Sequence, residues 1–391
     1  MLNPEIAATE LASVPLRALL AGARRKQPEL LKLIEELVRT ESPSGDKTAV
    51  DACAAIAVEE ARRLGGRVKF HRQKQYGDVL ELRFGPRRKL PAERILLLGH
   101  LDTVWPVGTL ATMPYRKSGG KLYGPGVLDM KAGVAMAFTA LGMLLEAELL
   151  QREVVLLLNS EEELGSPVSR PITEQLAKEA VGVYVLEAAQ GLACKTARKG
   201  TGNFRIEVQG VAAHAGVDFE KGANALVELS RVIQTVSGWS NLKSGLTVSV
   251  GCAGGGTKTN VVPAHAWAEV DVRFARKGDA ARIEKKFHSL RPADARCALA
   301  LEGGINRPPM ERTAATVRQY KKARLLAAGL GFVLDEASTG GASDGNFTAA
   351  LGVATLDGLG AVGEGAHADH EHLLLEHLAP RTALLAALLA R

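Results

Sequence analysis

Histidine and aspartate side chains that could bind a metal gather in residues 98–133. His100 and Asp102 follow Arg94–Gly99, an apolar run typical of a strand buried on both faces. If the extended conformation continues, their side chains point the same way, because strand side chains alternate with a period of two. At metal sites such a carboxylate orients the histidine ring or a bound water. The stretch therefore has the residue types of a metal centre.

Asp129 lies near the other end of this stretch. It follows the Gly124-Pro125-Gly126 turn and precedes Met130–Leu145, which is rich in Ala, Leu and Met and predicts a helix. The residue could cap that helix or face a cleft as a ligand. Taken alone, its position favours the cap.

Further acidic residues follow two other apolar runs. The segment Asn159–Ser166, NSEEELGS, comes after Val154–Leu158, and Glu187 ends the run Val183–Leu186. Three consecutive glutamates could be a solvated charge run. However, α/β folds bind ligands at the carboxyl ends of their strands, which favours a functional role for these acids.

Histidines recur near the end of the chain and in its middle. His367, His370 and His372 share the loop GAHADHEH, which lacks the HExxH spacing, so we expect one ligand and two surface residues. Three residues of the middle region have ordinary structural interpretations. His214 could be solvated, Arg273 could pair with a nearby acid, and Asn260 could be a turn residue: these alternatives stay open on the residues alone.

Composition excludes several classes of protein. The chain of 391 residues is 46% hydrophobic and 24% charged, as in ordinary soluble globular proteins. Its net charge of +6 comes from scattered Lys and Arg without interleaved aromatics, so we expect no nucleic-acid partner, and the charge suits small anionic substrates. The four cysteines form no CxxC pair, which argues against a disulfide framework or a thiolate zinc site.

No targeting segment is expected. The first 22 residues carry Glu5 and Glu10 where a secretion signal has positive charge and then an unbroken apolar core. No run approaches the roughly 18 apolar residues of a membrane span. We therefore expect a cytoplasmic protein without a membrane partner.

Two glycine motifs lack the context of nucleotide-binding loops. The GxGxxG match at Gly358–Gly363 is followed by EGAHADHEH and not by an apolar-faced helix. The segment Gly251–Thr259 lacks the glycine that a P-loop requires before Lys258. Both a nucleotide-dependent dehydrogenase and a nucleotide hydrolase are thus disfavoured.

The periodicity predicts two kinds of domain. Pro28–Val38 and Thr48–Leu64 predict helices, and strands then alternate with helices as far as Leu186, which indicates an α/β sheet with substantial parallel pairing. From about Gly200 the order becomes β-α-β-β-α-β, that of a ferredoxin-like unit. We predict an α/β domain formed by residues 1–199 and 309–391, interrupted by a small α+β domain at residues 200–308.

Six segments together resemble one enzyme family. GHLDTV, GPGVLDMKAG, EEELGS, HAG, TNVVP and the late GAH resemble, in family order, the co-catalytic zinc peptidases. That family contains glutamate carboxypeptidase, aminoacylase, acetylornithine deacetylase and succinyl-diaminopimelate desuccinylase. The resemblance extends from about Leu30 to the C-terminus, and it implies that the inserted domain is a ferredoxin-like dimerisation or lid domain.

The resemblance implies two zinc ions, for which Co²⁺ or Mn²⁺ could substitute. Two histidines and three carboxylates would be the ligands: His100, Asp129, Glu163, Glu187 and His367. Asp129 would bridge the ions, with His100 and Glu187 on one of them. Glu163 and His367 would hold the other. A cis peptide bond between Asp129 and Met130 is implied as well.

Further roles follow from the same resemblance. Asp102 would support the His100 side, and Glu162 would be the general base, because the EExG spacing leaves Glu161 over. Four residues would bind substrate: His214, Asn260, Arg273 and Gly341. His214 commonly arrives from the partner subunit, and Arg273 would grip the substrate carboxylate, which suits a planar bidentate donor.

These roles predict a dizinc hydrolase that resembles glutamate carboxypeptidase. It would cleave an amide and release a free amino acid, by means of a metal-bridging hydroxide and a glutamate base. An N-acyl-amino-acid deacylase with the same mechanism is the alternative within the family. From a different class, a non-catalytic metal-binding scaffold would require Glu162 to be dispensable. The partners of the predicted enzyme would be a small peptide or N-acyl amino acid as substrate and a second copy of the chain.

Overall fold

The computed structural model describes residues 14–87 and 94–390. The first 13 residues, on which part of the expectation of no secretion signal rests, lie outside the described residues. The chain forms two compact units. The first comprises the chain up to Ala197, Arg312–Ser338 and the chain from Ser343, and the second comprises Arg198–Glu311 and Thr339–Ala342. The predicted inserted domain did not include these four residues after Ser338.

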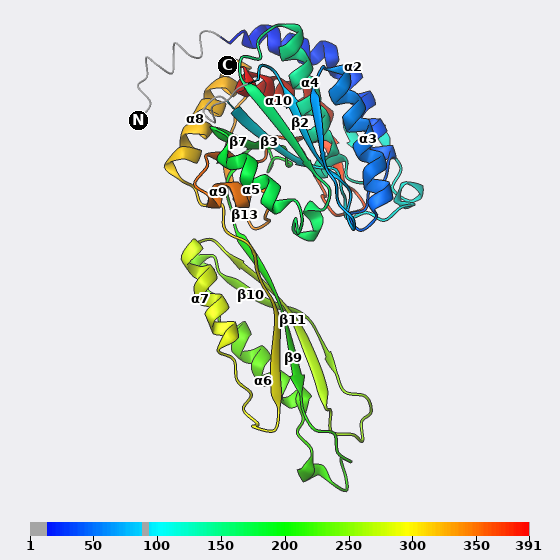
Figure 1. The fold of residues 1–391 in the computed structure, drawn as a ribbon, viewed down its shortest axis with the longest axis vertical. Helices are drawn as coiled ribbons and strands as arrows, with labels where there is room; N and C mark the ends of the chain where they lie inside the picture. Colours follow the sequence, from blue (N-terminus) through cyan, green and yellow to red (C-terminus); the bar gives the residue numbers. More distant parts are fainter. Residues whose placement is uncertain (1–13, 88–93, 391) are drawn as a thin grey trace. The chain divides into compact units, whose positions relative to one another are not determined.

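A six-stranded mixed sheet forms the centre of the first unit (Figure 1). Its strands, in spatial order, are β1 (Arg67–His71), β2 (Val79–Phe84), β6 (Glu153–Asn159), β3 (Arg94–His100), β7 (Gly182–Val185) and β14 (Thr355–Leu356). The pairs β6–β3, β3–β7 and β7–β14 are parallel, whereas β1–β2 and β2–β6 are antiparallel. The predicted α/β class with a mixed, largely parallel sheet is confirmed.

Apolar residues on both faces of the central strands hold helices against the sheet. On β3, Ile95 and Leu97 belong to the larger core and Leu96 and Leu98 to a smaller one, because successive side chains point to opposite faces. The larger core includes residues of α2 (Leu16–Arg39), α3 (Lys47–Arg63), α4 (Ala132–Glu146), α8 (Ala314–Gly329) and α10 (Leu375–Leu389). The smaller core includes α5 (Arg170–Lys178), near α9 (Gly345–Ala350).

Helix α2 begins earlier than its sequence predicts. The prediction began at Pro28, whereas the helix begins at Leu16 and Pro28 lies inside it. Proline lacks the N–H that an interior helical position donates. Leu19 and Ala23 are buried before the proline and Leu30 after it, so tertiary packing of a continuous apolar face outweighs this local cost.

Short strands outside the central sheet bring distant loops together. Their order is β15 (Gly363–Glu364), β16 (His372–Leu374), β5 (Lys121–Tyr123) and β4 (Arg116–Ser118). His372 pairs with Tyr123, so the histidine loop between β15 and β16 lies next to the glycine turn that precedes Asp129. A second small sheet pairs β8 (Cys194–Arg198) with β13 (Glu336–Thr339).

The second unit has the predicted β-α-β-β-α-β order. Its elements are β9 (Gly200–Gln209), α6 (Ala225–Ser237), β10 (Thr247–Gly255), β11 (His265–Phe274), α7 (Lys277–His288) and β12 (Ala298–Arg307). The sheet order is β10-β11-β9-β12, with every pair antiparallel. Phe204 of β9 and Phe287 of α7 stack with ring centroids 3.9 Å apart. They belong to a hydrophobic core that is formed within the second unit.

One helical segment passes a length and composition test for a membrane span within residues 14–87 and 94–390. It is Val127–Glu146, and 89% of its apolar window is buried inside the protein. A core helix of a globular domain passes the same test, so the segment is weak evidence for a span.

Candidate active site

The carboxyl ends of three neighbouring parallel strands bring the predicted metal ligands together. His100 ends β3, Glu163 follows β6, and Glu187 follows β7. Asp129 comes from η3 (Val127–Lys131), the turn before α4, and His367 from the loop between β15 and β16. The bond between Asp129 and Met130 is cis, as the resemblance implied.

His100, Asp129 and Glu187 form the first group of donors. The Nε2 atom of His100 lies 3.3 Å from Asp129 Oδ1 and 3.6 Å from Glu187 Oε1. The Nδ1 atom lies 2.9 Å from the main-chain carbonyl of Asp102, so Nδ1 donates its hydrogen to that carbonyl and Nε2 is the ring atom that faces the carboxylates.

Asp129 also belongs to a second group of donors, through its other oxygen. Its Oδ2 lies 3.4 Å from His367 Nε2, which lies 3.2 Å from Glu163 Oε1. Within each group the potential ligand atoms lie within 4.8 Å of one another. The two groups therefore share one carboxylate.

Two buried atoms show that these donors suit a metal ion. In the described part of the chain, His100 Nε2 and Asp129 Oδ1 are buried without a hydrogen-bond partner. Buried polar groups are normally satisfied, and a cation between these atoms would satisfy both. Imidazole and carboxylate donors suit Zn²⁺ and other divalent ions.

The local interpretation of Asp129 as a helix cap is wrong. The N-cap position of α4 is Lys131, and no side chain accepts a cap hydrogen bond there. Asp129 instead lies between His100 and His367, two partners that come from distant parts of the chain. Local sequence could not reveal either contact.

The histidines and carboxylates of the two donor groups shift one another's pKa values. Burial lowers the pKa of His100, but Asp102, Asp129 and Glu187 raise it well above its ordinary value. Asp129 and Glu163 raise the pKa of His367 to about 10. Burial raises the pKa of Asp129, but the two histidines lower it below its ordinary value. The carboxylates thus hold positive charge at the site, which protons supply when no metal is bound.

Asp102 joins the His100 strand to the glutamate turn. Its buried carboxylate accepts hydrogen bonds from the backbone N–H groups of Glu162 and Glu163, each at 3.1 Å, and from Ser44 Oγ at 2.6 Å. It contacts His100 through its main-chain carbonyl, while its carboxylate lies 3.4 Å from Nδ1. Sequence reasoning missed Ser44, whose SPSG turn carried only a loop signal.

The three consecutive glutamates are not a solvated charge run. Glu161 is 0% exposed and Glu162 7% exposed. The carboxylate of Glu161 accepts hydrogen bonds from Ser169 N and Ser160 Oγ, each at 2.7 Å, which leaves it a structural role. Glu162 begins the short helix η4 (Glu162–Leu164) beside the predicted ligand Glu163, and its role as the base stays a prediction.

Only one histidine of the GAHADHEH loop joins a donor group among the described residues. His370 is exposed and lies 3.3 Å from Asp369. His372 is buried in β16, where its Nδ1 donates to the His370 carbonyl, so the expectation of two surface histidines is wrong for this residue. Glu371 between them is fully buried, and sequence reasoning missed it.

The predicted substrate-binding residues all belong to the second unit. His214 is exposed, and its Nδ1 accepts the N–H of Gly216 at 3.1 Å. Asn260 is exposed too, and the bridge from His214 to Val261 joins its loop to that of His214.

Arg273 and Gly341 make contacts within the same unit. Arg273 Nε donates to Asp271 at 2.9 Å, which is the pairing with a nearby acid that its strand position allowed. The main-chain carbonyl of Gly341 accepts a hydrogen bond from Arg198 at 3.3 Å. These contacts do not test a substrate role, and all four assignments stay predictions.

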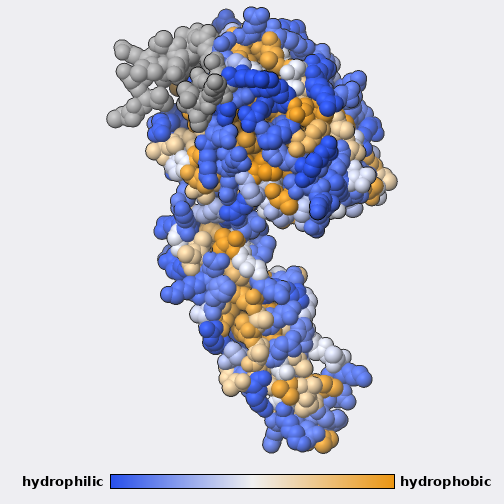
Figure 2. Space-filling view, viewed as in Figure 1, coloured by the Kyte–Doolittle hydropathy of each residue, from blue (hydrophilic) through white to orange (hydrophobic). Residues whose placement is uncertain are grey.

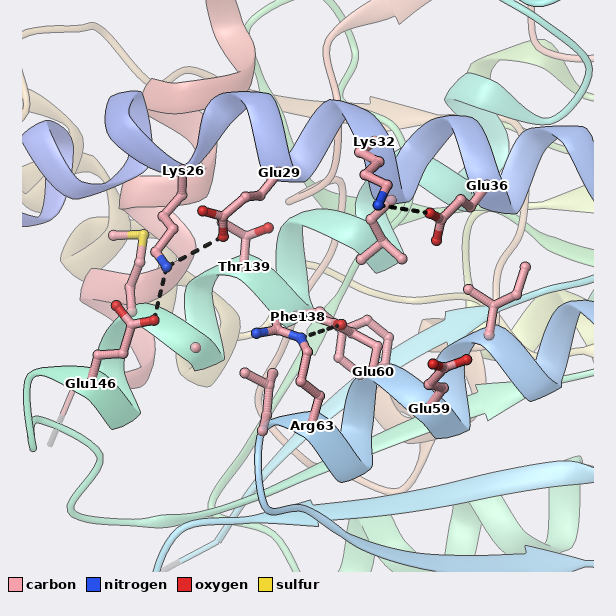
Figure 3. Close-up of a pocket in the computed structure, with 15 residues that line it drawn as sticks. Lys26, Glu29, Lys32, Glu36, Glu59, Glu60, Arg63, Phe138, Thr139 and Glu146 are labelled. Carbon is pink, nitrogen blue, oxygen red and sulfur yellow. Dashed lines mark hydrogen bonds and ion pairs between the residues drawn. The ribbon is translucent and has the colours of Figure 1, made fainter.

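A pocket of about 520 Å³ lies between α2, α3 and α4, away from the donor groups (Figure 3). Its lining includes none of the predicted site residues. Much of its charge is paired internally, Lys26 with Glu29 and Glu146, and Arg63 with Glu60. The donor groups at the strand ends, and not this pocket, define the candidate active site.

Histidine and carboxylate donors at the carboxyl ends of an α/β sheet are the framework of a metal-dependent hydrolase. A profile of Peptidase family M20/M25/M40 matches residues 96–391. Carboxypeptidase G2 of Pseudomonas sp. is 30% identical over 391 residues, which cover 98% of this chain and 93% of that protein. The chain belongs to peptidase family M20/M25/M40.

One further relative and two solved structures are similar to this chain, the structures in fold. Succinyl-diaminopimelate desuccinylase of Delftia acidovorans is 26% identical over 73% of this chain and 78% of its own length. Aminopeptidase PepT of Bacillus cereus has the same fold, with a TM-score of 0.74 and 21% identity, and covers 93% of this chain and 98% of its own. An M20 family metallo-carboxypeptidase of Sulfolobus solfataricus gives a TM-score of 0.73 at 17% identity, with the same coverage.

Proposed function

We propose that this protein is a dizinc carboxypeptidase that releases a C-terminal amino acid such as glutamate from an amide. The sharing of Asp129 between two donor groups carries the proposal, because a carboxylate with one oxygen in each group suits two adjacent ions. The similarity to carboxypeptidase G2 along almost the whole chain supports the carboxypeptidase activity.

Bound metal ions supply a nucleophile at neutral pH and polarise the scissile carbonyl. Glu162 accepts the proton of the attacking water and delivers it to the leaving nitrogen. Its position is favourable, because Asp102 fixes the backbone of Glu162 while Asp102 also holds the ring of His100. The base and a ligand are thus oriented by one residue.

The second unit supplies the grip on the substrate. Arg273 binds the free α-carboxylate of the substrate through two parallel N–H donors. To do so it releases Asp271, to which it donates in this structure. His214 and Asn260, on bridged loops, contact the scissile amide, and Gly341 contributes backbone to the substrate loop. These roles follow the family resemblance.

We also propose that the protein is a homodimer in which His214 serves the site of the partner copy. The second unit exposes the apolar residues Val217 and Phe219 shortly after His214 in the chain. Figure 2 shows apolar residues on the visible face of this unit. Mixing His214→Ala protein with Glu162→Gln protein tests the exchange. If His214 acts in trans, mixed dimers regain activity that neither variant has. No recovery after subunit exchange would contradict it.

A panel of matched amides decides the substrate. The zinc-loaded protein should hydrolyse N-acyl and peptidyl glutamates faster than the corresponding compounds without a free α-carboxylate. Faster cleavage of N-succinyl-diaminopimelate would favour a deacylase, a candidate that the similarity to the desuccinylase supports. No hydrolysis by protein with two bound zinc ions would refute both.

A further inference from the structure

Glu371 is a fully buried carboxylate that binds the loop carrying Asp129. Its Oε1 accepts the backbone N–H groups of Leu128 at 2.8 Å and Asp129 at 3.1 Å. Its Oε2 accepts the N–H of Gly126 at 2.9 Å and the indole N–H of Trp105 at 2.9 Å. The carboxylate thus has four donors, and one of them is the main chain of the shared ligand itself.

These hydrogen bonds join three segments that each carry a ligand. Trp105 follows His100 on the loop after β3, the turn Gly126–Asp129 ends at the shared ligand, and Glu371 follows His367 in its own loop. Gly126 has a φ of 68°, which favours glycine, so its N–H can point at the carboxylate. One side chain therefore holds together segments that are far apart in the sequence.

Lys131 holds the same turn from its other end. Its buried ammonium donates to the main-chain carbonyls of Leu37 and Thr40, each at 2.8 Å, at the end of α2. This contact anchors the turn to the core but touches neither donor group. Glu371 differs, because it alone of the two residues contacts Asp129 directly.

We propose that Glu371 is a positioning residue that holds Asp129 between the two donor groups, so that both metal ions bind tightly. The inference rests on the donor groups acting as a metal site. A carboxylate is required because all four neighbours are donors, and the amide nitrogen of a glutamine would face two N–H groups in place of accepting from them. Groups that orient ligands in this way typically contribute 10- to 100-fold to metal affinity.

The test compares three variants by calorimetric titration of the metal-free protein with Zn²⁺. Glu371→Gln should weaken zinc binding about 10- to 100-fold. Trp105→Phe, which removes one of the four donors and keeps an aromatic ring, should weaken it in the same direction by less. Asp369→Asn, a matched neutralisation of an exposed acid in the same loop, should leave zinc affinity unchanged.

Thermal unfolding of the metal-free variants separates positioning from general stability. If Glu371→Gln and Trp105→Phe lower the unfolding temperature but bind zinc as tightly as the unchanged protein, the role is structural and the proposal is wrong. Trp105→Phe gives this answer even if Glu371→Gln does not fold. Because no substrate is present, the outcome is independent of catalysis. An unchanged protein that binds zinc without hydrolysing any amide would refute only the proposed function.

Discussion

The metal donors of the first unit and the predicted substrate residues of the second differ in how firmly they are held. His100 is 1% exposed, and the backbone around Asp129 and Glu163 is bound by the buried carboxylates of Glu371 and Asp102. His214 and Asn260 lie exposed on loops, and Arg273 is held by a surface ion pair. The first unit thus preorganises the candidate metal site, whereas the predicted substrate residues remain adjustable. Changes in the two regions should therefore have different consequences.

Loss of Asp129 should have the largest effect. Asp129→Ala removes a carboxylate from both donor groups at once. Loss of a residue that only orients a ligand lowers metal affinity by up to about 100-fold, so zinc affinity should fall by more than this at both sites. Activity should vanish with the metal. Elemental analysis after gel filtration measures the zinc content. Asp369→Asn, which neutralises an exposed acid outside the donor groups, is the control, and an Asp129→Ala protein with two zinc ions would contradict this prediction.

Loss of Glu162 should separate metal binding from turnover. Glu162→Gln should lower kcat by about 10² to 10⁴, the usual contribution of a general base, and leave the zinc content unchanged. Steady-state kinetics on the best amide of the panel, with zinc analysis of the same sample, checks both quantities. Retained activity would remove Glu162 from the role of base.

Loss of Arg273 should change substrate binding alone. Arg273→Ala should raise KM by about 10- to 100-fold for substrates with a free α-carboxylate, because hydrogen bonds between charged groups contribute about 1.5–3 kcal/mol. Zinc affinity should not change. Arg205→Ala is the matched control, since Arg205 pairs with Glu207 two residues along β9 as Arg273 pairs with Asp271 on β11. Equal effects of the two variants would contradict a specific grip.

The release of protons when zinc binds should be the smallest effect. It should come only from the first unit, which contains His100 and His367. The pKa of His367, raised to about 10, keeps its ring protonated at pH 7 in the metal-free protein, and the pKa of His100 is raised as well, whereas zinc requires both rings neutral. Zinc affinity should thus fall as the pH falls, with protons released on binding. Calorimetry in buffers with different ionisation enthalpies measures this release, and a heat independent of the buffer would contradict it.

The same pKa shift has the opposite consequence for the metal-free fold. Protonated His367 stabilises that fold fully below the unfolded pKa of 6.5, and this contribution is lost as the pH rises through about 10. Zinc-loaded protein should not show this loss, because its histidines are already neutral. The unfolding temperatures of both forms against pH report the difference.

The sequence predicted that His100 and several acids lie at strand ends, because buried strands have a strong apolar signal. His100, Glu163 and Glu187 follow such strands, and parallel neighbours place their carboxyl ends at one edge of the sheet. The family resemblance implied the ligand role of all five residues and the shared role of Asp129, whose own position favoured a helix cap. The structure brings all five together in two groups.

The supports of these ligands could not be predicted from local patterns. Strands β15 and β16 have two and three residues, too few for a periodicity signal, yet their pairing with β5 places Glu371 beside the Asp129 turn. Glu371 itself was one acid in a polar loop. The predicted helix began at Pro28, too late in the chain, because tertiary packing and not local propensity extends α2 back to Leu16.

The shared carboxylate is the central claim, and anomalous diffraction at the zinc edge from crystals of the zinc-loaded protein tests it most directly. We expect two zinc peaks about 3.5 to 4 Å apart, with one oxygen of Asp129 on each. One of them should contact His100 and Glu187, and the other Glu163 and His367. A single peak, or two peaks of which only one contacts Asp129, would contradict the account.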